Sequence, residues 1–418
     1  MTTTIEPLLK TQFFAATAAE EAKQEQMLGG VALPLYGTVK PGFEPVRDAF
    51  AANLLTGCDV GAAAAVFIDG EPVVDLWGGY FDHTYTREWQ RDTIVQLFSS
   101  TKTMSALCAL LLADRGEIDV NAPVTKYWPE FGAAGKSNVL VRHILGHASG
   151  VAGWTEAMTL DDIYDIEKSC ALLARQEPWW EPGRASGYHG FNFGHLVGEI
   201  IRRVTGQTLG KFFRKEIAEP LGVEYYIGTP AEKDSQVSLI MQGYPIQPGG
   251  NALFKRALLN PPARPFDTWS LGWRRSEMGG LNGHGNAYAI AALQSLVANG
   301  GTKGKTVLSD KGRLRVLEPQ TTGVDLVLGI PMVWGMGYCL IPWITPADVA
   351  AAPPKVAERL GKRVGHWGGG GGSMSYVDLD ARLSFGYTPN RWITGPHEHD
   401  RSMNVLRAVY GCLARQAR

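Results

Sequence analysis

Strand-like sequence is confined to the two ends of this 418-residue chain, and this distribution constrains the fold more than any other feature. Near the start, apolar runs at 62–68 and 72–80 flank Asp69-Gly70, which is the pattern of a hairpin with a tight turn. Near the end, three more runs have strand character: 335–341, 374–378 and 383–387. Helical patterns broken by Gly and Pro fill the middle. The sequence therefore predicts an α+β fold with one sheet built from both chain ends and a separate, mostly helical lobe.

This distribution also divides the chain into regions. We expect residues 44–95 and 331–418 to form the sheet lobe and residues 96–330 the helical lobe. Residues 1–43 are expected to form an N-terminal arm, helical or loose, because they begin with a stretch rich in Ala, Glu, Gln and Lys. The periodicity predicts helices over 44–56, 196–204, 289–298 and 402–415.

Composition excludes several classes of partner. The chain is 45% hydrophobic and 19% charged, which is enough apolar sequence for a large core. A net charge of −1 and the lack of a basic run argue against nucleic-acid binding. No apolar stretch is long enough to cross a membrane, and the N-terminus lacks the pattern of a secretory signal. The five cysteines are odd in number and widely spaced, which favours reduced thiols and a cytoplasmic location: Cys58, Cys108, Cys170, Cys339 and Cys412.

The tetrapeptide Ser99-Ser100-Thr101-Lys102 is the strongest candidate for chemistry. If a helix begins at Ser99, the hydroxyl of Ser99 and the amine of Lys102 lie one turn apart on the same face. A serine hydroxyl needs a neighbouring base to become a good nucleophile, and a buried lysine can supply it. On its own the tetrapeptide favours a helix cap at Ser99 and a solvated lysine, and its context is needed to favour chemistry.

Two further segments carry functional patterns. Glu181-Pro182-Gly183 is a turn signal that precedes Tyr188 and then a long amphipathic helix, and a tyrosine can act as a general acid or base. Late in the chain, His366-Trp367 leads into five successive glycines, 368–372. Glycines let a bare backbone N–H approach a substrate carbonyl, as an oxyanion hole requires, although a flexible turn would need them too.

In this order, the three segments resemble the serine beta-lactamase and penicillin-binding-protein superfamily. The closest resemblance is to class C beta-lactamases and family VIII carboxylesterases, which share one fold. Secondary landmarks of the family follow in its order between about residues 44 and 415: 142–150, 282–285, 298–301, 334–338 and 385–387. The resemblance implies a central antiparallel sheet flanked by helices, with the inserted helical lobe carrying Ser99, Lys102 and Tyr188.

The resemblance also implies a mechanism. Ser99 would attack an ester carbonyl and form an acyl-enzyme, with Lys102 and Tyr188 as the general base and acid; which of the two is the main base stays open. The backbone N–H groups of Ser99 and Gly369 would hold the oxyanion, with His366, Trp367 and Gly368 beside the substrate. No cofactor and no metal are expected.

Departures from the family favour ester substrates. Class C beta-lactamases carry Tyr-x-Asn and Lys-Thr-Gly where this chain has Gly190 and His366-Trp367-Gly368. The lost amide and ammonium would help to hold a beta-lactam, and Trp367 suits an apolar acyl or alcohol group. We therefore expect a carboxylesterase that acts on small, short-chain esters, with an oligomeric state that the sequence leaves open.

Other functions remain as alternatives. The same site could serve an amidase, a D-peptidase, an aminohexanoate-oligomer hydrolase or a transesterase, with weak beta-lactamase activity, or it could belong to a non-catalytic penicillin-binding-like protein. His143 and His147 could share a metal ion, as could the segment 397–400, but a structural pair and a solvated loop are the favoured interpretations.

Overall fold

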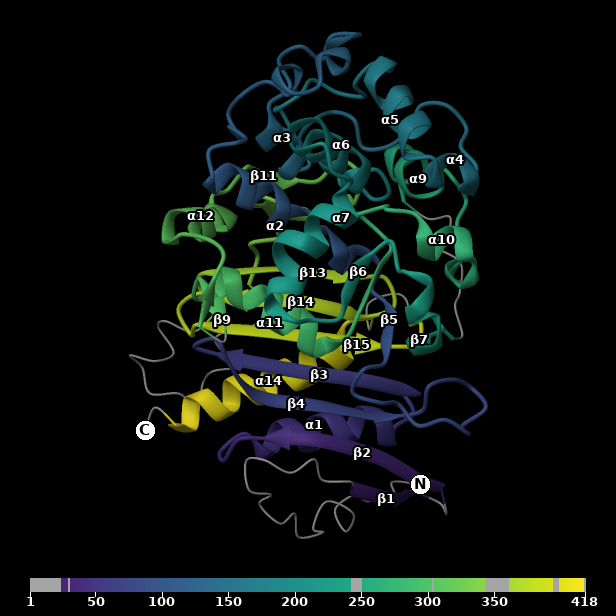
Figure 1. Ribbon diagram of the computed structural model, residues 1–418, viewed down its shortest axis with the longest axis vertical. Helices are drawn as coiled ribbons and strands as arrows, with labels where there is room; N and C mark the ends of the chain where they lie inside the picture. Colours follow the sequence, from purple (N-terminus) through teal and green to yellow (C-terminus); the bar gives the residue numbers. More distant parts are fainter. Residues whose placement is uncertain are drawn as a thin grey trace.

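Strands from both ends of the chain meet in one antiparallel sheet. The computed structural model describes residues 24–28, 31–241, 250–302, 304–342, 361–393 and 398–416. Seven strands lie in the order β1-β2-β4-β3-β15-β14-β13, so that β3 from the first quarter of the chain pairs with β15 from its end (Figure 1). The strands are β1 (Gln24–Leu28), β2 (Val31–Val39), β3 (Gly61–Ile68), β4 (Glu71–Gly79), β13 (Val364–Gly369), β14 (Ser373–Asp378) and β15 (Leu383–Pro389).

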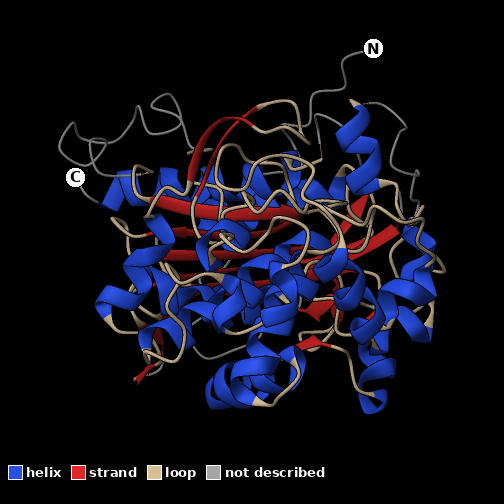
Figure 2. Cartoon of the chain, turned by 90° about the horizontal axis from the view of Figure 1, so that it is seen from above, coloured by secondary structure: helices blue, strands red, loops and turns tan. Residues whose placement is uncertain are grey.

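Helices cover both faces of this sheet (Figures 1 and 2). On one face, α11 (Ala287–Ala298) packs on β3 and β15. Close approach is possible because Gly386 lies against the backbone of Ala287, where an added Cβ would be 2.4 Å from the Ala287 carbonyl oxygen. On the other face lie α1 (Glu44–Leu55) and α14 (Asp400–Gln416), which pack against each other and enclose a second apolar core.

The middle of the chain forms the helical lobe around α2 (Thr101–Asp114). Every residue of α2 from Thr101 to Ala113 is buried, as expected for a helix that is apolar on nearly all sides. Around it lie α3 (Val141–Leu145), α4 (Leu160–Tyr164), α5 (Ile166–Arg175), α6 (Phe193–Thr205), α7 (Leu209–Phe213), α8 (Glu219–Leu221), α9 (Ala252–Leu258), α10 (Leu271–Arg275) and α12 (Asp310–Leu314).

A small four-stranded sheet joins this lobe to the rest, in the order β6-β8-β5-β7. Its members are β5 (Ile94–Gln96), β6 (Tyr225–Ile227), β7 (Val237–Ser238) and β8 (Gly283–Gly285). Two hairpins complete the described strands: β9 (Gly301–Thr302) with β10 (Lys305–Thr306), and β11 (Thr321–Val324) with β12 (Pro331–Trp334).

The predicted fold class is confirmed, and so is the hairpin at Asp69-Gly70, where both residues have positive φ, 53° and 79°. Three details differ from the sequence analysis. The expected N-terminal arm ends in sheet, because β2 pairs with β4; residues 1–23 lie outside the described residues. The segment 335–341 is not a strand, since Cys339 forms only isolated bridges. The expected lobe boundary after residue 95 falls inside β5, and the one after residue 330 falls between the paired strands β11 and β12.

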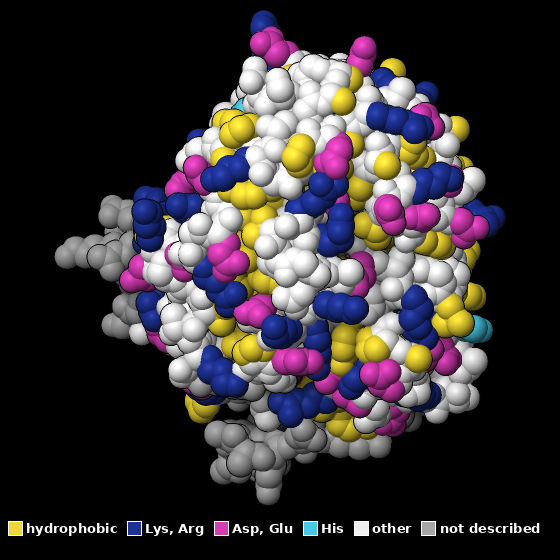
Figure 3. Space-filling model, turned by 45° about the horizontal axis from the view of Figure 1, so that its top comes forward, with side chains coloured by type: hydrophobic (Ala, Val, Ile, Leu, Met, Phe, Trp, Pro, Cys, Tyr) yellow, Lys and Arg dark blue, Asp and Glu magenta, His cyan; other side chains and the backbone are white. Residues whose placement is uncertain are grey.

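Charged side chains of both signs are interspersed over the face shown in Figure 3, in keeping with the net charge of −1. Within the described residues, no helix combines the length and the apolar character needed to cross a membrane.

Candidate active site

Ser99 lies where β5 passes into α2. The amide of Leu97 donates to the Gly283 carbonyl oxygen at 2.8 Å, which fixes the end of the strand. Phe98 then adopts a left-handed backbone, with φ of 46°, and starts a short 3-10 turn (Phe98–Ser100) that leads directly into α2. A positive φ is unfavourable for a bulky residue, so the packing of Phe98 on Trp392, with ring centroids 4.6 Å apart, helps to hold this turn.

Hydroxyl pairs fasten this turn to the main sheet. Ser100 Oγ lies 2.9 Å from Ser373 Oγ, and Thr103 Oγ1 lies 3.0 Å from Ser375 Oγ on β14. The Ser373 hydroxyl also contacts the Leu97 carbonyl oxygen at 2.7 Å. The nucleophile's turn is therefore positioned by strands that lie more than 250 residues later in the chain.

The structure brings Ser99, Lys102 and Tyr188 together. Lys102 Nζ lies 3.1 Å from Ser99 Oγ, and the Tyr188 hydroxyl contacts the same Ser99 Oγ at 2.7 Å. Lys102 Nζ also lies 4.8 Å from the centre of the Tyr188 ring. A serine flanked by an amine and a phenol has the arrangement of an activated nucleophile.

Burial alters the acidity of both partners. Lys102 is fully buried, and its Nζ donates to the backbone carbonyls of Gly190 and Gly280, each at 2.7 Å. Desolvation lowers the Lys102 pKa well below its usual value, which favours the neutral amine. Desolvation also raises the Tyr188 pKa, even though Ser99 and Trp367 hydrogen-bond to the phenol. The pair therefore favours an uncharged amine beside an uncharged phenol.

Aromatic rings hold Tyr188 in place. The indole Nε1–H of Trp367 donates to the Tyr188 hydroxyl at 3.0 Å, and Trp334 stacks on the Tyr188 ring with a 5.8 Å separation and an interplanar angle of 7°. The His147 ring also packs on Tyr188, with ring centroids 5.2 Å apart.

His143 and His147 belong to no group of three or more metal-ligating side chains among the described residues.

Alternation along β13 sends neighbouring side chains in opposite directions. Trp367 points to Tyr188, and Gly369 lies against the Leu97 carbonyl oxygen, where a Cβ would be only 2.0 Å from that oxygen. His366 was predicted to lie beside the substrate, but its buried side chain contacts the Ile341 carbonyl oxygen at 2.7 Å and stacks on Tyr376, away from Trp367. His366 therefore belongs to the packing behind the strand.

Glu398 and His399, just before α14, are half-buried against the glycine run. The amide of Gly371 donates to Glu398 Oε1 at 2.7 Å, and a Cβ on Gly368 would be 2.3 Å from the His399 ring. The interpretation of 397–400 as a solvated loop is therefore wrong for Glu398 and His399; His397 lies outside the described residues.

An apolar cavity of about 100 Å³ opens beside Ser99 and Tyr188. Its walls are mainly hydrophobic and include Phe98, Phe191, Leu258, Trp273, Leu281 and Trp392. Trp367, which was predicted to lie beside the substrate, is not part of this cavity wall but contacts the Tyr188 hydroxyl next to it. At Gly190 a Cβ would be only 2.0 Å from Leu258 Cδ2, so Leu258 of α9 occupies the space that a larger side chain at position 190 would need.

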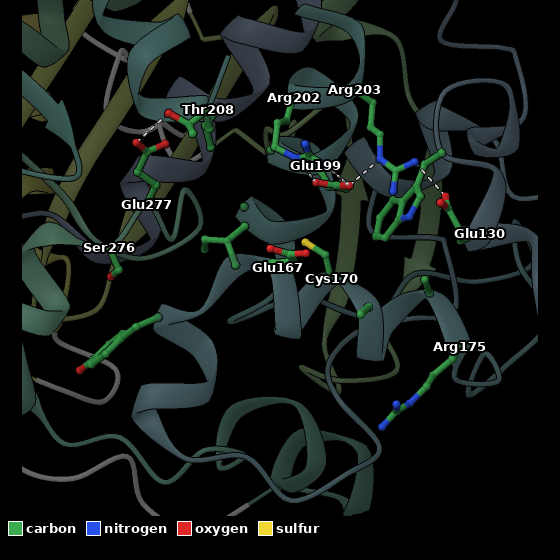
Figure 4. A pocket seen from close by; sticks show the side chains of 18 of the residues that line it. Glu130, Glu167, Cys170, Arg175, Glu199, Arg202, Arg203, Thr208, Ser276 and Glu277 are labelled. Atoms are coloured by element: carbon green, nitrogen blue, oxygen red, sulfur yellow. Dashed lines mark hydrogen bonds and ion pairs between the residues drawn. The ribbon is translucent and has the colours of Figure 1, made fainter. Parts of the chain in front are cut away.

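A larger cavity, about 940 Å³, lies elsewhere in the helical lobe and does not include Ser99 (Figure 4). Its most buried charge is Glu199, which pairs with Arg202 and Arg203 at 2.7 and 2.6 Å. Glu277 accepts hydrogen bonds from Thr208 Oγ1 and from the backbone of Gly210. Glu199 and Glu277 therefore both have hydrogen-bond partners, whereas the smaller cavity borders Ser99.

The chain is similar to several known proteins. The beta-lactamase family model matches residues 50–410. The esterase/beta-lactamase LipL of Mycobacterium tuberculosis is 31% identical, and the match covers 86% of this chain and 84% of LipL. The esterase EstB of Burkholderia gladioli is 28% identical, over 78% of this chain and 84% of EstB.

Solved structures extend the likeness to the whole fold. A family VIII carboxylesterase superposes with a TM-score of 0.82 at 39% identity, covering 90% of this chain and 99% of the other. A penicillin-binding-protein homologue from Caulobacter crescentus gives the same TM-score at 32% identity, over the same shares of the two chains.

Two contributors to the site escaped the sequence analysis. Leu258 has no motif around it, and only its contact with Gly190 reveals it. Asp325 likewise lies in no recognisable pattern, although its carboxylate accepts the backbone N–H of Tyr188 at 3.0 Å.

We expect a fluorophosphonate probe to label Ser99 and no other serine. Ser99→Ala should abolish both labelling and ester turnover with little change in thermal stability, because it removes a single oxygen. Ser100→Ala is the matched control: its hydroxyl bonds to Ser373, so this variant should still be labelled. Intact-mass spectrometry after labelling checks both. Labelling that survived in Ser99→Ala would exclude Ser99 as the nucleophile.

Proposed function

This chain belongs to the beta-lactamase family, and from that premise we propose that it is a carboxylesterase that hydrolyses short-chain esters through an acyl-enzyme on Ser99. At the coarser level, it is a serine hydrolase of the esterase and beta-lactamase type. The observation that carries the finer proposal is the contact of Ser99 Oγ with both Lys102 Nζ and the Tyr188 hydroxyl, beside an apolar cavity.

In the first half of the reaction, Ser99 Oγ forms a bond to the ester carbonyl carbon while the Lys102 amine accepts the serine proton. The neutral amine that burial favours can accept this proton, and the protonated phenol of Tyr188 can deliver one to the leaving alkoxide. The ester C–O bond then breaks and the alcohol leaves. Lys102 returns a proton to Tyr188, so the two groups work as one unit.

In the second half, a water molecule attacks the acyl-enzyme. The Lys102/Tyr188 unit accepts its proton and returns one to Ser99 Oγ, so the carboxylic acid leaves and the enzyme is restored. We assign the oxyanion to the backbone N–H groups of Ser99 and Gly369. Two observations support this assignment. Ser99 lies in the short 3-10 turn that leads into α2, and Gly369 passes so close to the Leu97 carbonyl oxygen that only a glycine fits there.

The cavity supports small apolar groups over large polar ones. A volume of about 100 Å³ accommodates a few carbon atoms, and its hydrophobic walls would favour an alkyl chain over a charged amide. In the class C pattern an asparagine follows Tyr-x, whereas this chain has Gly190 there, and Leu258 Cδ2 fills the space where a Cβ would stand. The site therefore lacks the amide that would help to bind a beta-lactam side chain.

A weak beta-lactamase activity is the second candidate. The relative LipL is named as both an esterase and a beta-lactamase. The same Ser99, Lys102 and Tyr188 arrangement could open a lactam ring slowly without the groups that hold the lactam in class C enzymes.

We expect Lys102→Ala and Tyr188→Phe each to slow acylation by about 100-fold or more, the scale of losing a general acid or base. The double variant should be little slower than the slower single one, because the two groups move one proton between them. Pre-steady-state release of p-nitrophenol measures the acylation rate. Losses that simply multiplied in the double variant would contradict the shared-proton mechanism.

Ester cleavage should exceed beta-lactam cleavage by a wide margin. We expect rapid turnover of p-nitrophenyl acetate or butyrate and slow or undetectable turnover of nitrocefin, because the site lacks the asparagine and lysine of the class C pattern. Comparing the two kcat/KM values on one preparation checks this. Equal values for nitrocefin and p-nitrophenyl butyrate would return the chain to the beta-lactamases.

Leu258 should set the acyl length that the site accepts. Leu258→Ala enlarges the cavity next to Gly190, so the ratio of kcat/KM for p-nitrophenyl octanoate to that for butyrate should rise about tenfold. Leu253→Ala, on the same helix but outside the cavity wall, serves as the matched control and should leave the ratio unchanged. An unchanged ratio in Leu258→Ala would place the acyl chain elsewhere.

A further inference from the structure

A buried carboxylate lies behind the tyrosine of the site. Asp325 is fully buried, at the start of the turn between β11 and β12. Its Oδ1 accepts the backbone N–H groups of Val327 and Leu328 at 3.0 and 2.9 Å, which closes that turn. A carboxylate placed there only to shape a turn would need nothing more.

The remaining bonds of Asp325 go to the catalytic side. Oδ1 also accepts the backbone N–H of Tyr188 at 3.0 Å, and Oδ2 accepts the indole Nε1–H of Trp334 at 3.0 Å. Trp334 is the ring stacked on Tyr188. The Asp325 carboxylate thus holds both the backbone of Tyr188 and the Trp334 ring, which stacks on the Tyr188 ring and orients it.

A second set of contacts completes the frame. The amide of Leu326 donates to the Ser186 carbonyl oxygen at 2.8 Å, so the turn and the segment before Tyr188 are joined twice. Trp334 meets Trp367 edge-on, with ring centroids 4.7 Å apart, and Trp367 donates to the Tyr188 hydroxyl. A shift of Trp334 would therefore move both the face and the hydroxyl contact of the tyrosine.

We propose that Asp325 is a positioning residue for catalysis: through Trp334 and the Tyr188 backbone, it holds the Tyr188 hydroxyl at hydrogen-bond distance from Ser99. This inference rests on the proposed role of Tyr188 in proton transfer. Misplacing a catalytic group by about 1 Å can cost on the order of 100-fold in rate, so a residue that does not touch the substrate can still control the reaction.

Asp325→Asn is the sharpest substitution because it keeps the shape. The amide oxygen can still accept the three backbone N–H groups, but the new NH₂ then faces the Trp334 indole N–H, so two donors oppose each other. Trp334→Phe removes that indole N–H while it keeps an aromatic ring in place. The double variant Asp325→Asn/Trp334→Phe has no opposed donors and should recover part of the activity that Asp325→Asn loses.

The chain offers a matched control far from the site. Asp378 is also fully buried and closes a strand turn, with four donors: the amides of Asp380, Ala381 and Gly361 and the hydroxyl of Tyr410. Asp378→Asn therefore disturbs a carboxylate of the same kind without touching Tyr188. It reports how much any loss of a buried turn aspartate affects the protein as a whole.

The experiment measures the second-order rate of Ser99 labelling by a fluorophosphonate, together with kcat and KM for p-nitrophenyl butyrate, well below each variant's unfolding midpoint. Asp325→Asn should label about tenfold more slowly, with a lower kcat and a KM within about threefold of the parent. Asp378→Asn should lower the unfolding temperature but keep the parent labelling rate. In a Tyr188→Phe background, Asp325→Asn should cause no further loss, because Asp325 acts through the phenol.

A parent labelling rate in folded Asp325→Asn would overturn the proposal, as would an equal extra loss in the Tyr188→Phe background. If Asp325→Asn does not fold, Trp334→Phe decides alone: a several-fold slower labelling with unchanged KM supports the positioning role, and parent kinetics refute it. Failure of the proposed function has a different signature, because Tyr188→Phe itself would then label at the parent rate.

Discussion

The site depends on a lysine amine held entirely out of water. Two backbone carbonyls, of Gly190 and Gly280, and the Ser99 hydroxyl surround Lys102 Nζ. An ammonium in such a place would lose its hydration, and among the described residues no carboxylate offsets that loss. The fold therefore favours the neutral amine. The apolar packing of α2 buries Lys102, so the same packing that forms the core also makes the lysine a base.

The two lobes share the work of building this environment. The helical lobe supplies Ser99, Lys102 and Tyr188, while β13 and β14 supply the strand edge, the Trp367 indole and the serine hydroxyls that fasten the nucleophile's turn. Burial of apolar side chains provides most of the stabilisation of the fold, but this interaction is non-directional and does not by itself orient the lobes. The few polar contacts across the junction, such as Ser100 with Ser373, set the register of one lobe on the other.

Local patterns made part of this arrangement predictable. Asp-Gly between two apolar runs specifies a tight turn, and three-residue spacing on a helix brings Ser99 and Lys102 together. Contacts between distant segments could not be read in this way. Alternation on β13 allows His366 either to face the substrate or to turn inward, and only packing against Tyr376 decides. The meeting of Leu258 with Gly190 likewise depends on how α9 docks, which no local pattern encodes.

The pairing of β3 with β15 has a consequence for how the protein acquires its reactivity during synthesis. Ser99, Lys102 and Tyr188 all leave the ribosome long before β13, β14 and β15, which complete the sheet and carry Gly369 and Trp367. A growing chain that already contains its nucleophile still lacks the strand edge opposite it. The strand edge opposite Ser99 therefore forms only after β13, β14 and β15 have been synthesised and have joined the sheet.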